Sequence, residues 1–294
     1  MITPLSSSPP LRSPEQLSGD PDPSATTLDA APGVVPTPER TRPVPARTPF
    51  RRVQYVELRK MFDTRSGFWL MASIVITSTI ATVITLLVGD RDDLTFESFA
   101  AAIGSPMSVI LPVIGVLAVT SEWSQRTTLT TFTLVPGRSR VLAAKLLNTL
   151  AIGFVGMVIA LGVGALGNLV TSMITGIDPV WDISAGTFAQ IVLANELGML
   201  LGFALGLLFR SSPAAIVGYF VVNLVLPGLS GALASAQEWW ADNAGWFDIN
   251  DTRFLLFDGN LTSQDWAQLG VTSVLWIVLP LLIGTRLVLR SEVK

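Results

Sequence analysis

The stretch TFAQIVLANELGMLLGFALGLLF, residues 187–209, decides the fold of this chain. It is 23 residues long and carries a single charged side chain, Glu196. About 20 apolar residues in a helix cross the ~30 Å of hydrocarbon in a bilayer. Five more such stretches lie at residues 66–88, 103–121, 142–167, 213–235 and 267–289. The sequence therefore predicts an all-α membrane protein with six transmembrane helices, because a barrel would show alternating polarity instead of continuous apolar runs.

The composition limits the chemistry that this chain can perform. It contains no histidine and no cysteine, which excludes Ser-His-Asp and Cys-His nucleophiles, disulfides, and metal sites built on those ligands. It also contains no G-x-x-x-x-G-K-[ST] motif for binding ATP. We therefore expect no enzymatic activity, no catalytic residue, no metal site and no cofactor bound by this chain. We expect no nucleic-acid partner either.

The basic residues are distributed unevenly between the loops. Beyond residue 50, thirteen of them precede span one, follow span six, or lie near the loops that join spans two to three and four to five. The alternate loops hold only Arg91 and Arg253 among many aspartates and glutamates. Short loops rich in Lys and Arg remain in the cytoplasm. We therefore predict a multi-pass protein of the cell (inner or plasma) membrane with both termini cytoplasmic.

Two segments before the first span differ in character. Residues 1–49 contain 12 of the 19 prolines and no apolar periodicity, which predicts a disordered cytoplasmic tail. Residues 50–63, FRRVQYVELRKMFD, place apolar residues near helical spacing among basic ones. This pattern predicts an amphipathic helix on the inner leaflet, with a cytoplasmic extension of span one as the alternative. The second domain is then the six-span unit, residues 50–294.

The fifth span and the segment after it are less regular. Pro227-Gly228 interrupts span five, which must either continue past a kink or end early. The outer loop, residues 236–266, is rich in tryptophan. Either these side chains form an ordinary interfacial belt, or the loop is partly inserted as an outer cap.

Two spans carry rows of small residues that we expect to serve helix packing. Small side chains let helix backbones approach each other in a membrane. Because the connection between spans three and four is short, we predict that the two rows face each other, with a dimer seam on span four as the alternative. The rows are Gly156, Ala160 and Gly164 in span three, and Gly198, Gly202 and Gly206 in span four.

Glu196 is the one acid well inside a span, and an ionisable group at that depth is a candidate for function. Helical geometry places it about 200° around the helix from Gly198, so it points away from the glycine row. We expect it to face a transport pathway, a cleft between subunits, or a buried partner such as Asn223 or Asn148. The alternative is a structural acid that never meets a substrate.

The inner loop between spans two and three, residues 122–141, is the most specific segment. Leu129 and Phe132 form a short apolar ridge at helical spacing, and Pro136-Gly137 ends it. A cytoplasmic helix that exposes such a ridge needs a partner to cover it, unless the ridge simply enters lipid.

This loop resembles the corresponding loop in the permeases of ABC-2 type exporters. The resemblance covers residues 50–294, and one departure is Thr127-Thr128 where the family usually has Gly-Thr. It implies an amphipathic elbow helix, six spans in a type V exporter-like architecture, an outer kinked segment after span five, and a coupling helix that sits in a groove of a separate ATPase subunit. The positions that carry it are Glu122, Arg126, Thr127, Pro136, Arg138 or Arg140, and Lys145.

The resemblance implies the membrane-spanning permease of an ATP-binding-cassette transporter that exports a small molecule, a lipid-like compound or an ion. It also implies a second permease copy, identical or not, and ATP and Mg²⁺ held on the ATPase partner. A secondary transporter is one alternative, although ion coupling in such a protein would require more buried acids or broken midplane helices. A membrane scaffold or signalling anchor is the other, and it would need no exposed ridge.

Overall fold

The computed structural model describes residues 49–63, 65–90, 94–124 and 138–290 of the chain. These residues belong to one compact unit, Arg47–Lys294. Most of the predicted tail, residues 1–48, and most of the predicted coupling loop, residues 125–137, lie outside the described part. The fold below is that of the described residues.

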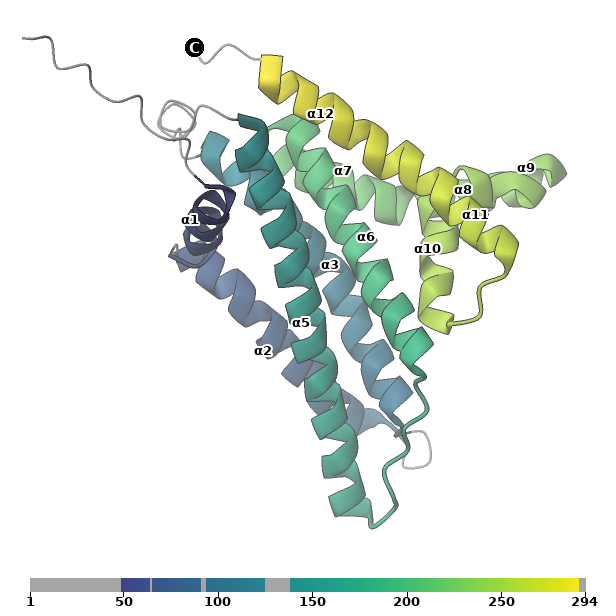
Figure 1. Cartoon of the computed structure of the whole chain (residues 1–294). Helices are drawn as coiled ribbons and strands as arrows, with labels where there is room; N and C mark the ends of the chain where they lie inside the picture. Colours follow the sequence, from purple (N-terminus) through teal and green to yellow (C-terminus); the bar gives the residue numbers. More distant parts are fainter. Residues whose placement is uncertain (1–48, 64, 91–93, 125–137, 291–294) are drawn as a thin grey trace, which may run out of the picture. The chain divides into compact units, whose positions relative to one another are not determined.

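All regular structure in the described residues is helical, which confirms the predicted class (Figure 1). Six segments are long and apolar enough to cross a membrane, so this is a multi-pass membrane protein by length and composition. The helices are α1 (Phe50–Asp63), α2 (Arg65–Val88), α3 (Phe96–Ser124), α5 (Arg138–Thr175), α6 (Ala185–Phe209), α7 (Ser212–Phe220), η2 (Val221–Val225), α8 (Leu226–Ala236), α9 (Glu238–Asn243), η3 (Ala244–Trp246), α10 (Ile249–Asp258), α11 (Ser263–Ser273), η4 (Val274–Val278) and α12 (Leu279–Arg290).

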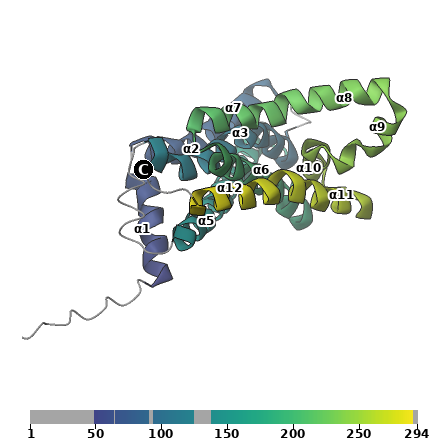
Figure 2. The same cartoon turned by 90° about the horizontal axis from the view of Figure 1, so that it is seen from above.

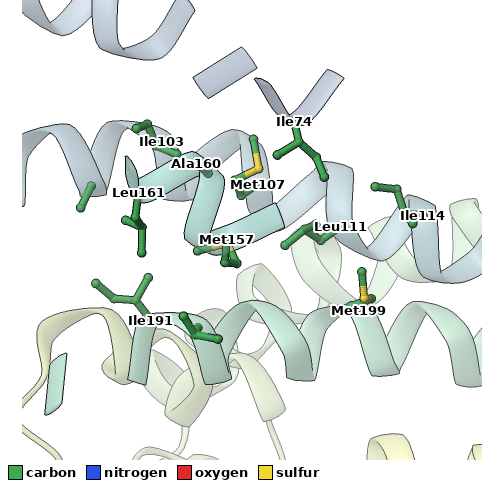
Figure 3. Close-up of a cluster of buried hydrophobic side chains, with 12 residues drawn as sticks. Ile74, Ile103, Met107, Leu111, Ile114, Met157, Ala160, Leu161, Ile191 and Met199 are labelled. Atoms are coloured by element: carbon green, nitrogen blue, oxygen red, sulfur yellow. The ribbon is translucent and has the colours of Figure 1, made fainter. Parts of the chain in front are cut away.

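Helix α6 is the central element of the unit. It is the most buried of the six spans and packs against α3, α5, α7, α10 and α12. The largest apolar cluster lies where α2, α3, α5 and α6 meet (Figure 3). It includes Met107 and Leu111 of α3, Met157 of α5 and Met199 of α6, all with no measurable exposure. The span made by α2 and the two made by α7–α8 and α11–α12 are mostly exposed in the single chain, as expected of helices whose apolar side chains face lipid.

The predicted pairing of the two small-residue rows is wrong. A Cβ at Gly202 would collide with the backbone of Pro112 in α3, and one at Gly206 would lie 3.2 Å from the Val116 carbonyl oxygen of the same helix. The approach is equally close from the other helix, because a Cβ at Gly115 of α3 would lie 2.5 Å from the Met199 carbonyl oxygen of α6. The row on span four therefore packs against span two.

The row on span three also has other neighbours. A Cβ at Gly156 would lie 2.9 Å from Ile74 of α2, and one at Gly164 would lie 3.1 Å from Ile103 of α3. Ala160 is fully buried in the cluster shared by α2, α3, α5 and α6. Helices α5 and α6 do touch, but at Gly153. A small side chain lets another helix approach closely, but it does not determine which helix that is. The prediction that spans three and four pair, which was based on their closeness in sequence, was therefore wrong.

Spans five and six share one backbone feature, a π turn that precedes an internal proline. The helix Ser212–Ala236 runs through Pro227 because a π turn, Val221–Val225, precedes it. Span six repeats this arrangement, with a π turn at Val274–Val278 two residues before Pro280. A π turn absorbs the steric clash and the missing N–H of an internal proline. Span five therefore continues past its proline, and the alternative of an early end is wrong.

Helix α1 occupies the residues predicted for an amphipathic helix, Phe50–Asp63. Figures 1 and 2 show α1 turned out of the line of α2, so it is not a straight extension of the first span. Val53 packs against Val141 and Ala144 of α5, with Phe50 beside them. Tyr55 and Phe62 remain exposed on the other side of α1.

The α3–α6 contact predicts the effect of a bulky residue at Gly202. Gly202→Leu should separate α6 from Pro112 and lower the free energy of unfolding by about 1–3 kcal/mol or more, the usual range for overpacking. Gly162→Leu is the matched control, because nothing lies within 4 Å of a Cβ at that position. Thermal unfolding of the purified variants in detergent measures both. Equal melting temperatures for Gly202→Leu and Gly162→Leu would contradict the close α3–α6 approach.

Candidate functional site

Charged or ionisable side chains are buried at three junctions between helices in the described residues. A further buried acid, Asp248, caps the start of α10. The inner junction consists of Glu57 and Lys145 with the carbonyl of Ala118. The second place is the carboxyl group of Glu196, between α5 and α6. The outer polar cluster consists of Tyr219, Asn223, Asn250 and Arg253 with the carbonyl of Ser108.

The outer polar cluster begins at a proline inside α3. Pro112 has no N–H, so the carbonyl of Ser108, four residues earlier, lacks its helical donor. The hydroxyl of Tyr219 in α7 donates to that oxygen at 2.5 Å. Tyr219 is itself 2% exposed. A backbone carbonyl freed inside the membrane is thus satisfied by a side chain from another span.

A second freed carbonyl belongs to the π turn of span five. The N–H of Leu226 donates to Val221, and Pro227 has no N–H to give, so the carbonyl of Val222 has no helical donor. Asn250 of α10 fills that place, with its Nδ2 donating to the Val222 oxygen at 2.7 Å. Helix α10 is therefore tied to span five by a bond that the kink requires.

Arg253 lies one turn further along α10 and is 2% exposed. Its Nη2 donates to Oδ1 of Asn223 at 2.6 Å, and the Asn223 amide donates back to the carbonyl of Tyr219. A Cβ at position 198 would lie 2.7 Å from Nη1, so Gly198 leaves the guanidinium its space. The guanidinium carbon also stands 5.1 Å from the centre of the Phe254 ring, within cation–π range.

Glu196 lies on the other side of α6 from Arg253. Its Oε1 lies against Gly153 of α5, where a Cβ would collide with it, and Met199 lies beside the same glycine. Both carboxyl oxygens are buried and have no hydrogen-bond partner among the described residues. Neither Asn223 nor Asn148 forms a hydrogen bond with it, so the hydrogen-bond partners suggested by the sequence are wrong. Asn148 instead donates to the carbonyl of Gln54 in α1 at 2.8 Å.

The inner junction ties α1 to the spans. Glu57 is 3% exposed and pairs with Lys145 of α5 at 2.8 Å and with Lys60 at 2.7 Å. Lys145 also donates to the Ala118 carbonyl of α3 at 3.3 Å. Burial alone would raise the pKa of the Glu57 carboxyl, but Lys145 and Lys60 together outweigh it and hold this pKa below its usual value. One ammonium group therefore joins α1, α3 and α5.

The predicted coupling loop is placed only at its ends. Arg126, Thr127, Leu129, Phe132 and Pro136 lie outside the described residues. Glu122 belongs to the last turn of α3, and Arg138 and Arg140 belong to the first turn of α5. The loop therefore leaves and re-enters the bundle from the ends of α3 and α5, the two helices that Lys145 joins.

The structure also identifies buried charges that the sequence interpretation missed. Arg253 was noted only as one of two basic residues in the outer loops, and that rarity was the available signal. Glu57 lies among the basic residues of segment 50–63, and Lys145 is one of the positions that carry the resemblance, but no sequence signal pairs the two. Both become visible only when distant helices are brought together.

Comparisons with known proteins do not identify the chain: no family model matches it, and no curated protein matches it significantly.

The unpartnered carboxyl group predicts the effect of Glu196→Gln. A neutral amide of the same shape removes the need to keep this group uncharged in the membrane, so the melting temperature should stay the same or rise. Under the transport function proposed below, the rate of transport or its dependence on pH should change. Glu97→Gln, at an exposed position at the start of α3, is the control and should alter neither. Normal transport combined with poor expression would make Glu196 a structural residue.

The inner junction predicts a stability effect that depends on pH. Glu57→Gln leaves Lys145 buried without its partner and should lower the free energy of unfolding at pH 7 by about 3–5 kcal/mol. Because the pKa of Glu57 is lowered by folding, its contribution is complete above the usual carboxyl value of 4.5. The contribution is lost as pH falls through the lower value in the folded protein. The difference in unfolding free energy between wild type and variant should therefore shrink as the pH falls below 4.5.

Asp63→Asn is the matched control for this measurement. It removes an exposed pair, Arg59–Asp63 at 3.0 Å, which should be worth about 0–1 kcal/mol. Chemical unfolding in detergent at several pH values compares the two variants. Equal effects of Glu57→Gln and Asp63→Asn would rule out a special role for the inner junction.

Proposed function

We propose that this chain is the membrane-spanning permease subunit of an ATP-binding-cassette transporter, of the ABC-2 exporter type. A separate ATPase subunit binds ATP and Mg²⁺ and docks on the inner loop, residues 122–141. Two permease subunits, identical or not, pair around a central pathway. The cargo is a small molecule, a lipid-like compound or an ion. The charge pattern of the loops supports a cell-membrane location with both termini in the cytoplasm.

The observation that carries this proposal is the position of the inner loop. Its apolar ridge, Leu129 and Phe132, stands in a Thr-rich sequence that resembles a coupling helix. The loop connects α3 to α5, the helices bridged by Lys145. A separate helix α1 before span one and helices folded in after span five agree with the same family plan.

The packing suggests how a displacement of this loop would be transmitted to the transmembrane helices. Helix α5 begins at Arg138, and Lys145 lies two turns further along it, paired with Glu57 of α1 and donating to the Ala118 carbonyl of α3. The three helices would therefore move together at this junction. Helix α3 then contacts α6 directly through backbone at Gly115 and Gly202, with no flexible side chain between them. A shift of α3 would reach the centre of the bundle, where the spans alternate between inward-open and outward-open arrangements.

One observation favours the second candidate, a secondary transporter. Such a protein needs an ionisable group at membrane depth, and Glu196 has buried oxygens without a partner among the described residues. The two candidates differ in their energy source. Transport that needs ATP and a co-purifying ATPase supports the permease, whereas transport driven by an ion gradient through the chain alone supports the alternative.

The ridge predicts the effect of charge in the inner loop. Replacing Leu129 and Phe132 together with aspartate should abolish co-purification of the ATPase subunit and ATP-driven transport, because the ridge no longer has an apolar surface to bury. Membrane insertion should be unchanged. Asn260→Asp is the control, since it adds a charge at an exposed position between α10 and α11, outside residues 122–141. A complex that survives the double substitution with full activity would overturn the coupling assignment.

A further inference from the structure

Arg253 is a buried charge that cannot be removed by a change of protonation. An arginine side chain stays protonated in proteins, unlike a carboxyl group such as that of Glu196, which becomes neutral by taking up a proton. A buried guanidinium needs an opposite charge or a complete set of acceptors to offset the loss of water. The surroundings of Arg253 supply neither an opposite charge nor a complete set of acceptors.

The partners of Arg253 are neutral. Asn223 accepts from Nη2 at 2.6 Å, and the guanidinium also interacts with the Tyr219 side chain. Its Nε is buried and has no hydrogen-bond partner among the described residues. At least one donor of this rigid fork is therefore left for another acceptor.

The nearby acids do not provide the missing charge. Glu196 is on the same helix that Arg253 touches, but its carboxyl lies at Gly153 on the opposite side. Asp248 accepts from the N–H and the side-chain amide of Asn250. The pKa of Asp251 is raised by burial and then by the carboxylates of Asp248 and Asp265, so these acids stand close enough to repel one another. No ion pair joins Arg253 to a carboxylate in the described part of the chain.

We propose that Arg253 binds the anionic group of an amphiphilic ligand, a carboxylate or a phosphate, between α3, α6, η2 and α10. A guanidinium binds such groups through two parallel N–H bonds, one of which the unpartnered Nε would supply. The anionic oxygens would displace Oδ1 of Asn223 from Nη2. Nη1 already fills the space over Gly198, so the ligand would approach from the side of Nε and Nη2. Because Arg253 is 2% exposed, binding requires α10 to separate from α6.

The chemistry fits both a phospholipid headgroup and a soluble amphiphile. Both present an anion at one end and an apolar chain at the other, and the apolar surroundings of the site suit such a chain. Helix α10 follows span five and precedes span six, and its residues Ile249, Thr252 and Leu256 are fully buried. That the bound anion is the exported molecule rests on the proposed function, whereas binding itself does not.

The test measures ligand-dependent stability of the purified chain without any ATPase. In phosphatidylcholine nanodiscs, octyl phosphate below its micelle concentration should raise the melting temperature by about 5 °C at roughly a hundredfold excess over its dissociation constant. Octylamine should not. Arg253→Gln should lose the shift, and Arg253→Lys should keep part of it because the charge remains. Arg59→Gln, at an exposed position, should respond as wild type does.

A second arm identifies the source of the anion. Nanodiscs that contain phosphatidylglycerol are compared with phosphatidylcholine alone, without octyl phosphate. Stabilisation by phosphatidylglycerol that Arg253→Gln abolishes indicates a lipid headgroup, and a response to octyl phosphate alone indicates a soluble amphiphile. The proposal is overturned if neither anion stabilises the wild type, or if Arg253→Gln responds equally to both. A chain that binds the anion but never recruits an ATPase would retain this site and lose the proposed function.

Discussion

The direct contact between α3 and α6 is the constraint on which the rest of the structure depends. At Gly115, Gly202 and Gly206 the two helices meet with backbone against backbone, and a methyl group at Gly202 would already collide with Pro112. Between apolar helices in lipid there is no hydrophobic driving force, so association relies on such close packing. Once α3 and α6 are fixed, α5 packs on both of them, α2 closes the α3–α5 side, and α7, α10 and α12 cover α6. The apolar cluster of Figure 3 lies along this arrangement.

Kinks in the spans create the polar part of the core. Pro112 and the π turn before Pro227 each leave a carbonyl without a helical donor, and a bilayer offers no water to replace it. Tyr219 and Asn250 supply the missing donors from other elements. This requirement explains why α10, which follows span five in a polar segment, is folded against the spans. It also brings Arg253 to α6, where Gly198 leaves space for it.

The three helix junctions that bury ionisable side chains differ in how the charge is offset. Lys145 and Glu57 offset each other and thereby hold α1 to the ends of α3 and α5. Glu196 has no partner among the described residues, but a carboxyl group can be neutral by binding a proton. Arg253 has neutral partners and cannot lose its charge. Two of the three therefore belong to sites at which a proton or an anion is expected, and these lie on opposite sides of the central helix α6.

The sequence by itself determined the helical class, the six spans and the position of a helix before the first span. These features depend on local composition: about 20 apolar residues need a helix to cross a bilayer, whatever their neighbours are. It also identified Glu196 and the small-residue rows, because a charge or a glycine row inside an apolar run is visible without a structure. Only the tertiary structure decided which helices these residues meet. The glycines of span four face span two, Asn223 contacts Arg253 and not Glu196, and Lys145 pairs with an acid 88 positions earlier in the chain. Such contacts depend on how whole helices rotate and cross. The sequence of one span does not specify this, because the neighbouring helices decide which face of the span is buried.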